Sequence, residues 1–319
     1  MKRGERSASV PEVVRPGRRG SLLSDIVRDR QLYLMLIPVV AFYILFAYIP
    51  MYGLQIAWRN YDLIEGISAS PWVGLANFQW FFNHPHFFRV LSNTLLLSVY
   101  NILWGFPIPI ILAVMLNEVR VKRLRNAIQT CVLIPHFIAV VIVVGIVMRM
   151  LSPSSGVVNA IIMALGGESI YFMTEPGWFR TVFITMVNWQ GAGFASIIYL
   201  AAIAGIDQQL YEAAVIDGAN KWKQTLHVTL PGIMPTIIIL FIMRMGAILE
   251  VGFEPVLLLQ REITFSTSDV ISTFIFREGL VQAQFSRAAA VGFFNSFVGL
   301  LLVISANYTS KKLTETALW

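Results

Sequence analysis

Six long apolar stretches, separated by polar connections, dominate the pattern of the chain. They cover residues 32–58, 94–116, 127–151, 179–206, 232–259 and 288–307. Each has about 20 residues or more, which is the length of helix that crosses the hydrocarbon core of a bilayer. Spanning β-strands would instead show about 10 residues of alternating polarity. The pattern therefore predicts an all-α polytopic membrane protein with six transmembrane helices.

Proline interrupts three of these stretches. Pro38 and Pro50 lie in the first, Pro107 and Pro109 in the second, and Pro135 in the third. Proline cannot donate a backbone hydrogen bond, but neighbouring helices can satisfy the freed carbonyl groups inside a membrane. We therefore expect kinks rather than the ends of spans at these positions.

Basic residues between the stretches indicate the orientation of the chain. With the amino terminus in the cytoplasm, the cytoplasmic segments carry 16 lysines and arginines and the outer segments carry 7. Cytoplasmic loops of membrane proteins are enriched in these residues. We therefore expect both termini in the cytoplasm.

This topology divides the chain into four parts. Residues 1–31 are expected to form a cytoplasmic tail, and residues 32–93 the first transmembrane helix and an outer loop. Residues 94–308 are expected to form the core transmembrane domain, and residues 309–319 a second cytoplasmic tail. An apolar patch at 157–165, in an outer connection, is too short to cross a bilayer. It predicts an amphipathic or re-entrant segment.

Composition supports a lipid-embedded chain and argues against several classes of function. Hydrophobic residues make up 56% and charged residues 13% of the sequence, whereas soluble domains carry about 25% charged residues. No G-x-x-x-x-G-K-[ST] motif is present, so we expect no ATP or other cofactor bound by this chain. Neither H-E-x-x-H nor G-x-S-x-G occurs, so we expect no catalytic residues, no metal site and no enzyme activity. The basic tail lacks interleaved aromatic residues, which argues against a nucleic-acid partner.

The connection between the fourth and fifth stretches, residues 208–235, has the most informative local pattern. Residues 210–216 favour a helix, and Gly218 can adopt the positive φ that ends a helix and turns the chain. A second short helix is then expected to stop before Pro231. The result is a helix–turn–helix on the cytoplasmic face, whose small and charged residues suit docking into a cleft of a partner.

The same connection resembles a known family motif. It reads E-A-A, then D-G-A two residues later, and L-P twelve residues beyond Gly218. The positions are Glu212, Ala213, Ala214, Asp217, Gly218, Ala219, Leu230 and Pro231. This pattern resembles the E-A-A loop of permease subunits in binding-protein-dependent, ATP-driven (ABC) importers. In that family the loop forms a coupling helix that sits in a groove of a cytoplasmic ATPase.

Other stretches extend the resemblance over about residues 30–312. Residues 71–78 are similar to the start of sugar-type permeases, and residues 133–140 and 251–258 to the branch that moves complex saccharides. The resemblance implies a type I importer fold in the bacterial inner membrane. It also implies a second homologous permease, two copies of an ATPase that holds ATP and Mg²⁺, and an extracytoplasmic solute-binding protein.

Two charged residues of the fifth stretch are candidates for the substrate path. Arg244 and Glu250 lie within it or near its outer end. A charged side chain at the centre of a bilayer costs about 2.5–3.5 kcal/mol on insertion scales, so such residues face the bundle interior or water. A structural salt bridge to a neighbouring helix is an equally good interpretation.

Polar residues in two other stretches are further candidates. Asn188, Trp189 and Gln190 lie midway along the fourth stretch, and Asn295 lies in the sixth. Binding pockets combine an apolar or aromatic lining with a few placed polar groups, as a saccharide site requires. The alternative interpretation is hydrogen bonding between helices, which is common in membranes.

Two hypotheses of function follow. The first is a permease subunit that translocates an oligosaccharide or polysaccharide fragment by alternating access. The second is a stand-alone secondary sugar carrier or channel, which would be expected to show inverted repeats and charged relays at the midplane. The sequence shows neither feature, and it leaves the saccharide open.

Overall fold

The computed structural model of the chain describes residues 29–314. Residues 1–54 and 55–319 form two compact units. The described part of the first unit is helical: α2 (Arg30–Tyr43) continues through a π-helical turn, η1 (Ile44–Tyr48), and α3 (Ile49–Met51) into the 3-10 helix η2 (Tyr52–Trp58). Its apolar side chains are exposed along its length, as expected for a helix that lies in lipid. The predicted tail, 1–31, lies almost entirely outside the described residues.

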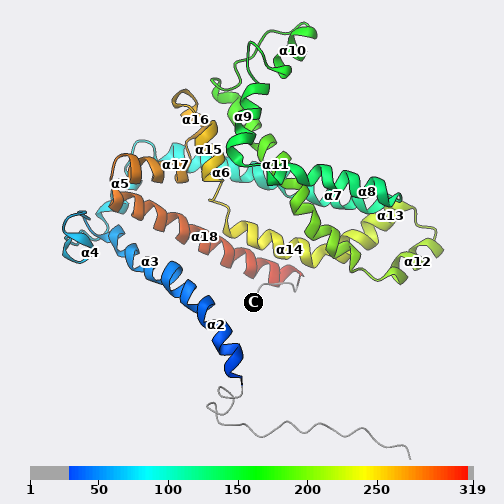
Figure 1. Ribbon diagram of the computed structural model, residues 1–319, viewed down its shortest axis with the longest axis horizontal. Helices are drawn as coiled ribbons and strands as arrows, with labels where there is room; N and C mark the ends of the chain where they lie inside the picture. Colours follow the sequence, from blue (N-terminus) through cyan, green and yellow to red (C-terminus); the bar gives the residue numbers. More distant parts are fainter. Residues whose placement is uncertain (1–28, 315–319) are drawn as a thin grey trace, which may run out of the picture. The chain divides into compact units, whose positions relative to one another are not determined.

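The unit that starts at residue 55 is built from helices (Figure 1). Among its described residues, β pairing is confined to an isolated bridge between Arg59 and Trp72. Its helices up to the fourth span are α4 (Gly66–Ala69), α5 (Ala76–Phe82), α6 (Phe87–Gly105), α7 (Pro107–Glu118), α8 (Lys122–Leu133), η3 (Ile134–Phe137), α9 (Val140–Met150), α10 (Val157–Ala164) and α11 (Pro176–Ala204). The later helices are α12 (Gln208–Ile216), α13 (Lys221–Gln224), η4 (Thr225–Thr229), α14 (Leu230–Gly246), α15 (Phe253–Leu259), η5 (Glu262–Thr264), α16 (Phe265–Ser268), α17 (Ile271–Phe276), η6 (Arg277–Val281) and α18 (Phe285–Thr314).

Five helices in the described chain are long and apolar enough to cross a membrane, and a bent pair can supply a sixth span. The bent pair is Lys122–Phe137 with Val140–Met150, and its two parts meet at 101° across residues 138–139, directly after the 3-10 turn that contains Pro135. The expected all-α fold with six membrane segments is thus confirmed. The short apolar patch forms α10, which has only 8 residues. The last helix continues to Thr314, past the expected start of the tail at 309.

The fifth stretch differs from the prediction at both ends. The helix begins at Lys221 and ends at Gly246 instead of covering 232–259. Beyond this helix the chain turns at Gly252, which has a φ of 94°, and α15 begins as a separate helix. Glycine adopts this left-handed backbone without steric penalty, so Gly252 allows the chain to turn just before α15 begins at Phe253. The expectation that residues 232–259 form one span was therefore wrong.

Helix α11 is at the centre of the packed bundle. It packs against α6, α7, α14 and α16, and its Phe183 is fully buried in the largest apolar cluster. Small residues allow the closest approaches, as is typical between membrane helices. On α18, for example, a Cβ atom at Gly299 would lie 2.9 Å from the carbonyl oxygen of Gly246 on α14.

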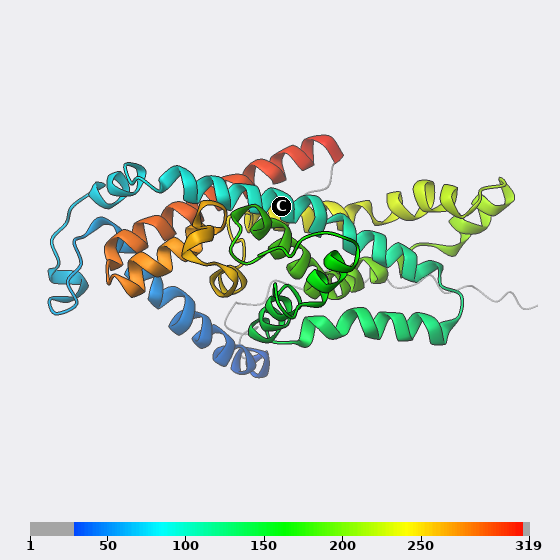
Figure 2. The same ribbon diagram turned by 90° about the horizontal axis from the view of Figure 1, so that it is seen from above.

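The two ends of this unit carry different elements. In both views α12 and α13 occupy one end, and α5 and α17 lie at the opposite end (Figures 1 and 2). The connection predicted to be cytoplasmic is therefore separated by the length of the bundle from connections predicted to be on the outer side.

Candidate functional site

The E-A-A segment forms a capped helix and a tight turn. Asp207 caps the start of α12, because its Oδ1 accepts a hydrogen bond of 2.9 Å from the backbone N–H of Gln209. At the other end Gly218 has a φ of 74°. The N–H of Ala219 donates to the carbonyl of Ala214 and that of Gly218 to the carbonyl of Val215, which is the Schellman pattern of helix termination. The predicted helix and its glycine stop are confirmed.

One face of this segment is exposed to solvent and is not covered by the rest of the chain. Glu212, Ala213 and Asp217 are exposed, and Ile216 is 85% exposed. Trp222, on the next helix, is 74% exposed. Exposed large apolar groups among charged ones mark an interaction surface rather than an ordinary solvated face.

Direct contacts join the segment to the membrane helices. The phenol oxygen of Tyr211 on α12 lies 2.9 Å from Oγ1 of buried Thr229, at the base of the fifth span. The ammonium group of Lys221 lies 3.3 Å from a carboxylate oxygen of Glu118, the last residue of α7. A cavity of about 580 Å³ lies between α12 and these helix ends. Helix α12 is thus joined to the fifth span through Tyr211, and α13 is joined to the end of α7 through Lys221.

The helix after the turn does not stop before Pro231, contrary to the prediction. It runs from α13 through the π-helical turn η4 into α14, and both Leu230 and Pro231 lie in its continuous course. The N–H of Leu230 reaches back five residues to the carbonyl of Thr225. This wider turn accommodates the proline, which has no N–H to donate and which normally disfavours helix in the preceding residue. The second half of the segment is thus a rigid extension of the fifth span.

A second candidate site is a cavity of about 710 Å³ between α6 and α11. Among the predicted path residues, Asn188 and Trp189 line it. The structure adds residues that the sequence patterns did not single out: Tyr100, Trp104, Ile108, Gly177, Arg180, Thr181, Ile184 and Thr185. Aromatic rings and hydrogen-bonding groups thus converge on one space, which is the composition of a saccharide site.

The other predicted path residues lie elsewhere. Gln190 turns away from the cavity and donates a hydrogen bond of 2.9 Å to the carbonyl of Ile138. Arg244 and Glu250 are exposed and border a separate small hollow beside Ser98. Asn295 lies on α18, with a buried Oδ1 that has no hydrogen-bond partner among the described residues. The predicted set is therefore not one site.

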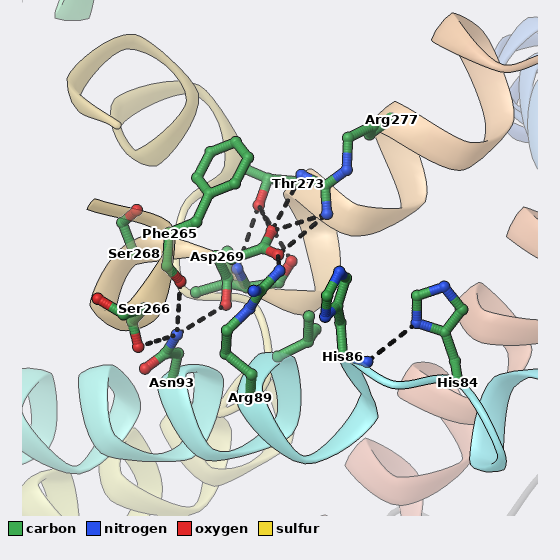
Figure 3. A network of polar contacts seen from close by, with 12 residues as sticks. His84, His86, Arg89, Asn93, Phe265, Ser266, Ser268, Asp269, Thr273 and Arg277 are labelled. Atoms are coloured by element: carbon green, nitrogen blue, oxygen red, sulfur yellow. Dashed lines mark hydrogen bonds and ion pairs between the residues drawn. The ribbon is translucent and has the colours of Figure 1, made fainter. Parts of the chain in front are cut away.

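A buried polar network lies at the end of the bundle opposite α12 (Figure 3). Asp269 is fully buried and accepts hydrogen bonds from Arg89 at 2.9 Å and from Arg277 at 3.0–3.1 Å. Asn93 donates to the backbone carbonyls of residues 265, 266 and 269, and its Oδ1 accepts from Arg180 at 2.9 Å. The network joins α6, α11 and the α16–α17 region, and its arginines outnumber its only carboxylate.

The network borders a histidine whose charge state affects stability. The N–H of His86 donates to Nδ1 of His84 at 3.2 Å, so that nitrogen must be unprotonated (Figure 3). Burial, and then the positive charges of His86 and Arg277, lower the pKa of His84 below its usual value of 6.5. The unfolded chain therefore binds the proton more readily, and stability is lost as the pH falls through about 6.5.

We expect His84→Phe to reduce this loss of stability in acid. Phenylalanine preserves the ring contacts with Trp80 and Phe274, whose centroids lie 4.9 and 5.2 Å from that of His84. The melting temperature of the detergent-purified protein, measured from about pH 8 to about pH 5, should fall less in the variant than in the wild type. An equal fall in both proteins would show that another group controls the acid sensitivity.

Within residues 29–314, no group of three or more His, Cys, Asp or Glu side chains is placed to hold a metal ion. Arg180 and Trp104, two of the cavity residues that the sequence patterns did not single out, come from different spans. Arg180 is the second residue of the fourth apolar stretch, and a charge at the end of a span is common at a membrane surface. No pattern in a single sequence indicates that Arg180 and Trp104 line the same cavity.

Known proteins resemble the chain over nearly its whole length. The family model described as "Binding-protein-dependent transport system inner membrane component" matches residues 105–315. The polygalacturonan/rhamnogalacturonan transport system permease protein YteP of Bacillus subtilis (strain 168) is 42% identical, with 100% of both chains covered.

Solved structures give the same result. A chain of a bacterial ABC transporter involved in the import of the acidic polysaccharide alginate is 47% identical, with a TM-score of 0.86 and coverage of 92% of this chain and 99% of that one. A chain of a bacterial alginate ABC transporter in complex with alginate pentasaccharide-bound periplasmic protein is 46% identical. It also has a TM-score of 0.86, with coverage of 93% and 99%.

Proposed function

Since this chain belongs to the family of binding-protein-dependent transport system inner membrane components, we propose that it is a permease subunit that imports an acidic oligosaccharide or polysaccharide fragment. The names of its relatives support this substrate class. One is a permease for polygalacturonan and rhamnogalacturonan, and another belongs to an importer of the acidic polysaccharide alginate. The subunit would act in the bacterial inner membrane by alternating access.

The proposal includes partners of three kinds. A solute-binding protein would deliver the saccharide, as suggested by the relative solved in complex with a saccharide-loaded periplasmic protein. A second permease would complete the path, and two ATPase subunits would hold ATP and Mg²⁺. This chain would form part of the path through the membrane, and it would carry the surface that contacts the ATPase.

The exposed face of α12 is the observation that carries the coupling role. It presents Glu212 and Asp217 beside Ile216, and Tyr211 of the same helix contacts Thr229 in the fifth span. The adjoining helix α13 contacts Glu118, at the end of α7, through Lys221. We propose that this face docks in a groove of the ATPase, so that closure of the ATPase dimer moves α12 and the fifth span together. The positions from Glu212 to Ala219 would form the contact, and Leu230 and Pro231 would begin the rigid span that follows.

Two substitutions test the coupling role. Glu212→Lys reverses an exposed charge on the docking face. Gly218→Pro is incompatible with the observed φ of 74°, because proline fixes φ near −65°. In proteoliposomes that contain the assembled transporter, either change should lower saccharide uptake by about tenfold or more and abolish the stimulation of ATPase activity by the binding protein.

The matched control is Glu168→Lys, which makes the same charge change at an exposed residue after α10. It should leave uptake and stimulation at wild-type levels, and all three variants should insert into the membrane. Normal coupling in both test variants would reject the proposed role of α12. Uptake by the purified chain without an ATPase would instead support the secondary-carrier hypothesis.

A further inference from the structure

The cavity between α6 and α11 is lined by aromatic rings from both helices and by polar groups from α11. Trp104 on α6 and Trp189 on α11 are 59% and 49% exposed, and Tyr100 is half-buried beside them. Arg180 and Asn188 complete the lining from α11. The volume of about 710 Å³ lies within the range of about 300–1,000 Å³ that is usual for ligand sites.

Arg180 is a cation without a carboxylate partner. Its Nη2 donates to the amide oxygen of Asn93, and its Nε is shielded from solvent without a hydrogen bond. Asp269, the carboxylate of the neighbouring network, is bound by Arg89 and Arg277 instead. Among the described residues, no ion pair neutralises Arg180. A half-buried guanidinium in this state attracts an anion, because its remaining donors are unsatisfied.

The position of Arg180 on its helix strengthens this attraction. It lies in the first turns of α11, which begins at Pro176, and Gly177 is also part of the cavity wall. The amino-terminal end of a 29-residue helix carries a partial positive charge from its free N–H groups. The helix end and the guanidinium therefore favour negative charge at the same end of the cavity.

These features match one class of ligand. A planar carboxylate fits the fork of a guanidinium with two parallel hydrogen bonds. The apolar face of a pyranose ring can lie against an aromatic ring, while its hydroxyl groups meet amide and hydroxyl side chains such as those of Asn188 and Thr181. A uronate unit of an acidic saccharide presents both kinds of surface.

We propose that this cavity binds a uronate unit of the saccharide in transit, and that Arg180 is the residue that distinguishes acidic from neutral sugar units. The inference rests on the proposed import function and deepens it, because it assigns the recognition of charge to one side chain. Asn93 acts as a positioning residue, since its Oδ1 holds Nη2 of Arg180 at 2.9 Å while its Nδ2 is anchored on three backbone carbonyls.

A binding assay at the cavity tests the inference without requiring transport. Thr185→Cys places a thiol in the cavity wall, and Cys131→Ser removes the native cysteine, which is exposed. In the assembled transporter, tetragalacturonate and tetramannuronate should each slow maleimide labelling of this thiol. Fully methyl-esterified tetragalacturonate, which lacks the negative charge, should protect about tenfold less well, because a charge-assisted hydrogen bond is lost.

Arginine variants in the same background identify the group responsible. Arg180→Gln should raise the concentration of tetragalacturonate needed for half protection by about tenfold and leave protection by the methyl ester unchanged. Arg180→Lys retains the charge without the fork and should give an intermediate value. Arg149→Gln makes the same charge change at an exposed residue of α9 and should have no effect.

The outcomes separate the inference from the import function. If the wild-type transporter imports tetragalacturonate but neither oligomer protects the thiol, the cavity is covered by lipid or by the second permease, and the inference fails alone. Equal protection by the acid and its ester would show that the carboxylate is not recognised, which also overturns it. Failure of the wild-type transporter to import any saccharide would reject the function, whereas binding would still be measured directly.

Discussion

Replacing Asp269 with alanine is expected to lower the free energy of unfolding by about 3 kcal/mol. The carboxylate is fully buried and bonded to two guanidinium groups from different elements, Arg89 on α6 and Arg277 on η6. Its removal leaves both cations without their counter-ion, and the loss of one partner from a buried ion pair is strongly destabilising. The value is at the low end of the range because the arginine side chains retain 31% and 24% exposure.

Thermal unfolding of the purified protein in detergent measures this effect. As a control, Glu168→Ala removes an exposed carboxylate and should change stability by less than about 0.5 kcal/mol. The double variant Asp269→Ala, Arg277→Met should recover part of the loss, because one unpaired cation is removed with its partner. A single variant as stable as the wild type would show that the network does not hold this end of the bundle together.

Replacing Gly193 with alanine is expected to disrupt the contact between α11 and α8. A Cβ atom at this buried position would lie 2.5 Å from the carbonyl carbon of Val132 and closer still to its oxygen. The obstacle is backbone rather than a flexible side chain, so α8 must move away from α11. We expect a loss of about 3 kcal/mol, the upper range for overpacking in a close-packed interior.

The same helix provides the matched control. Gly191 has open space around its virtual Cβ, and alanine there should be neutral or stabilise the helix by about 0.5–1 kcal/mol. Unfolding in detergent and the yield of folded protein should therefore separate Gly191→Ala from Gly193→Ala. Similar behaviour of the two variants would mean that α8 and α11 do not require this close approach.

Local patterns in the sequence were sufficient to predict the helix of the E-A-A segment and its end at Gly218. The helix-favouring run at 210–216, its small residues and the glycine stop act within about ten neighbouring residues, so the helix and its turn are encoded where they occur. Pro231 was misjudged because the rule for residues before proline assumes an ordinary α-helical turn. The wider turn formed by Thr225–Thr229 removes the conflict, and no local residue signals it.

The candidate cavity required the tertiary structure. Asn188 and Trp189 were selected as polar and aromatic residues inside a span, and both line the cavity. Gln190 satisfied the same criterion, but the next position on a helix is rotated by about 100°, and its side chain bonds elsewhere. Arg180 was not selected from the sequence. Its lack of a carboxylate partner depends on Asp269, 89 positions away, which is bound by Arg89 and Arg277 instead.

The sequence alone determined that the chain is a helical membrane protein, because apolar length and backbone hydrogen bonding leave few alternatives in lipid. It also determined the family, because a spaced motif on one short segment is a local signal. Only the tertiary structure decided which side chains share a cavity, which charges are paired and where the fifth span ends. These depend on contacts between distant segments and on backbone angles such as that of Gly252, which hydrophobic periodicity does not encode.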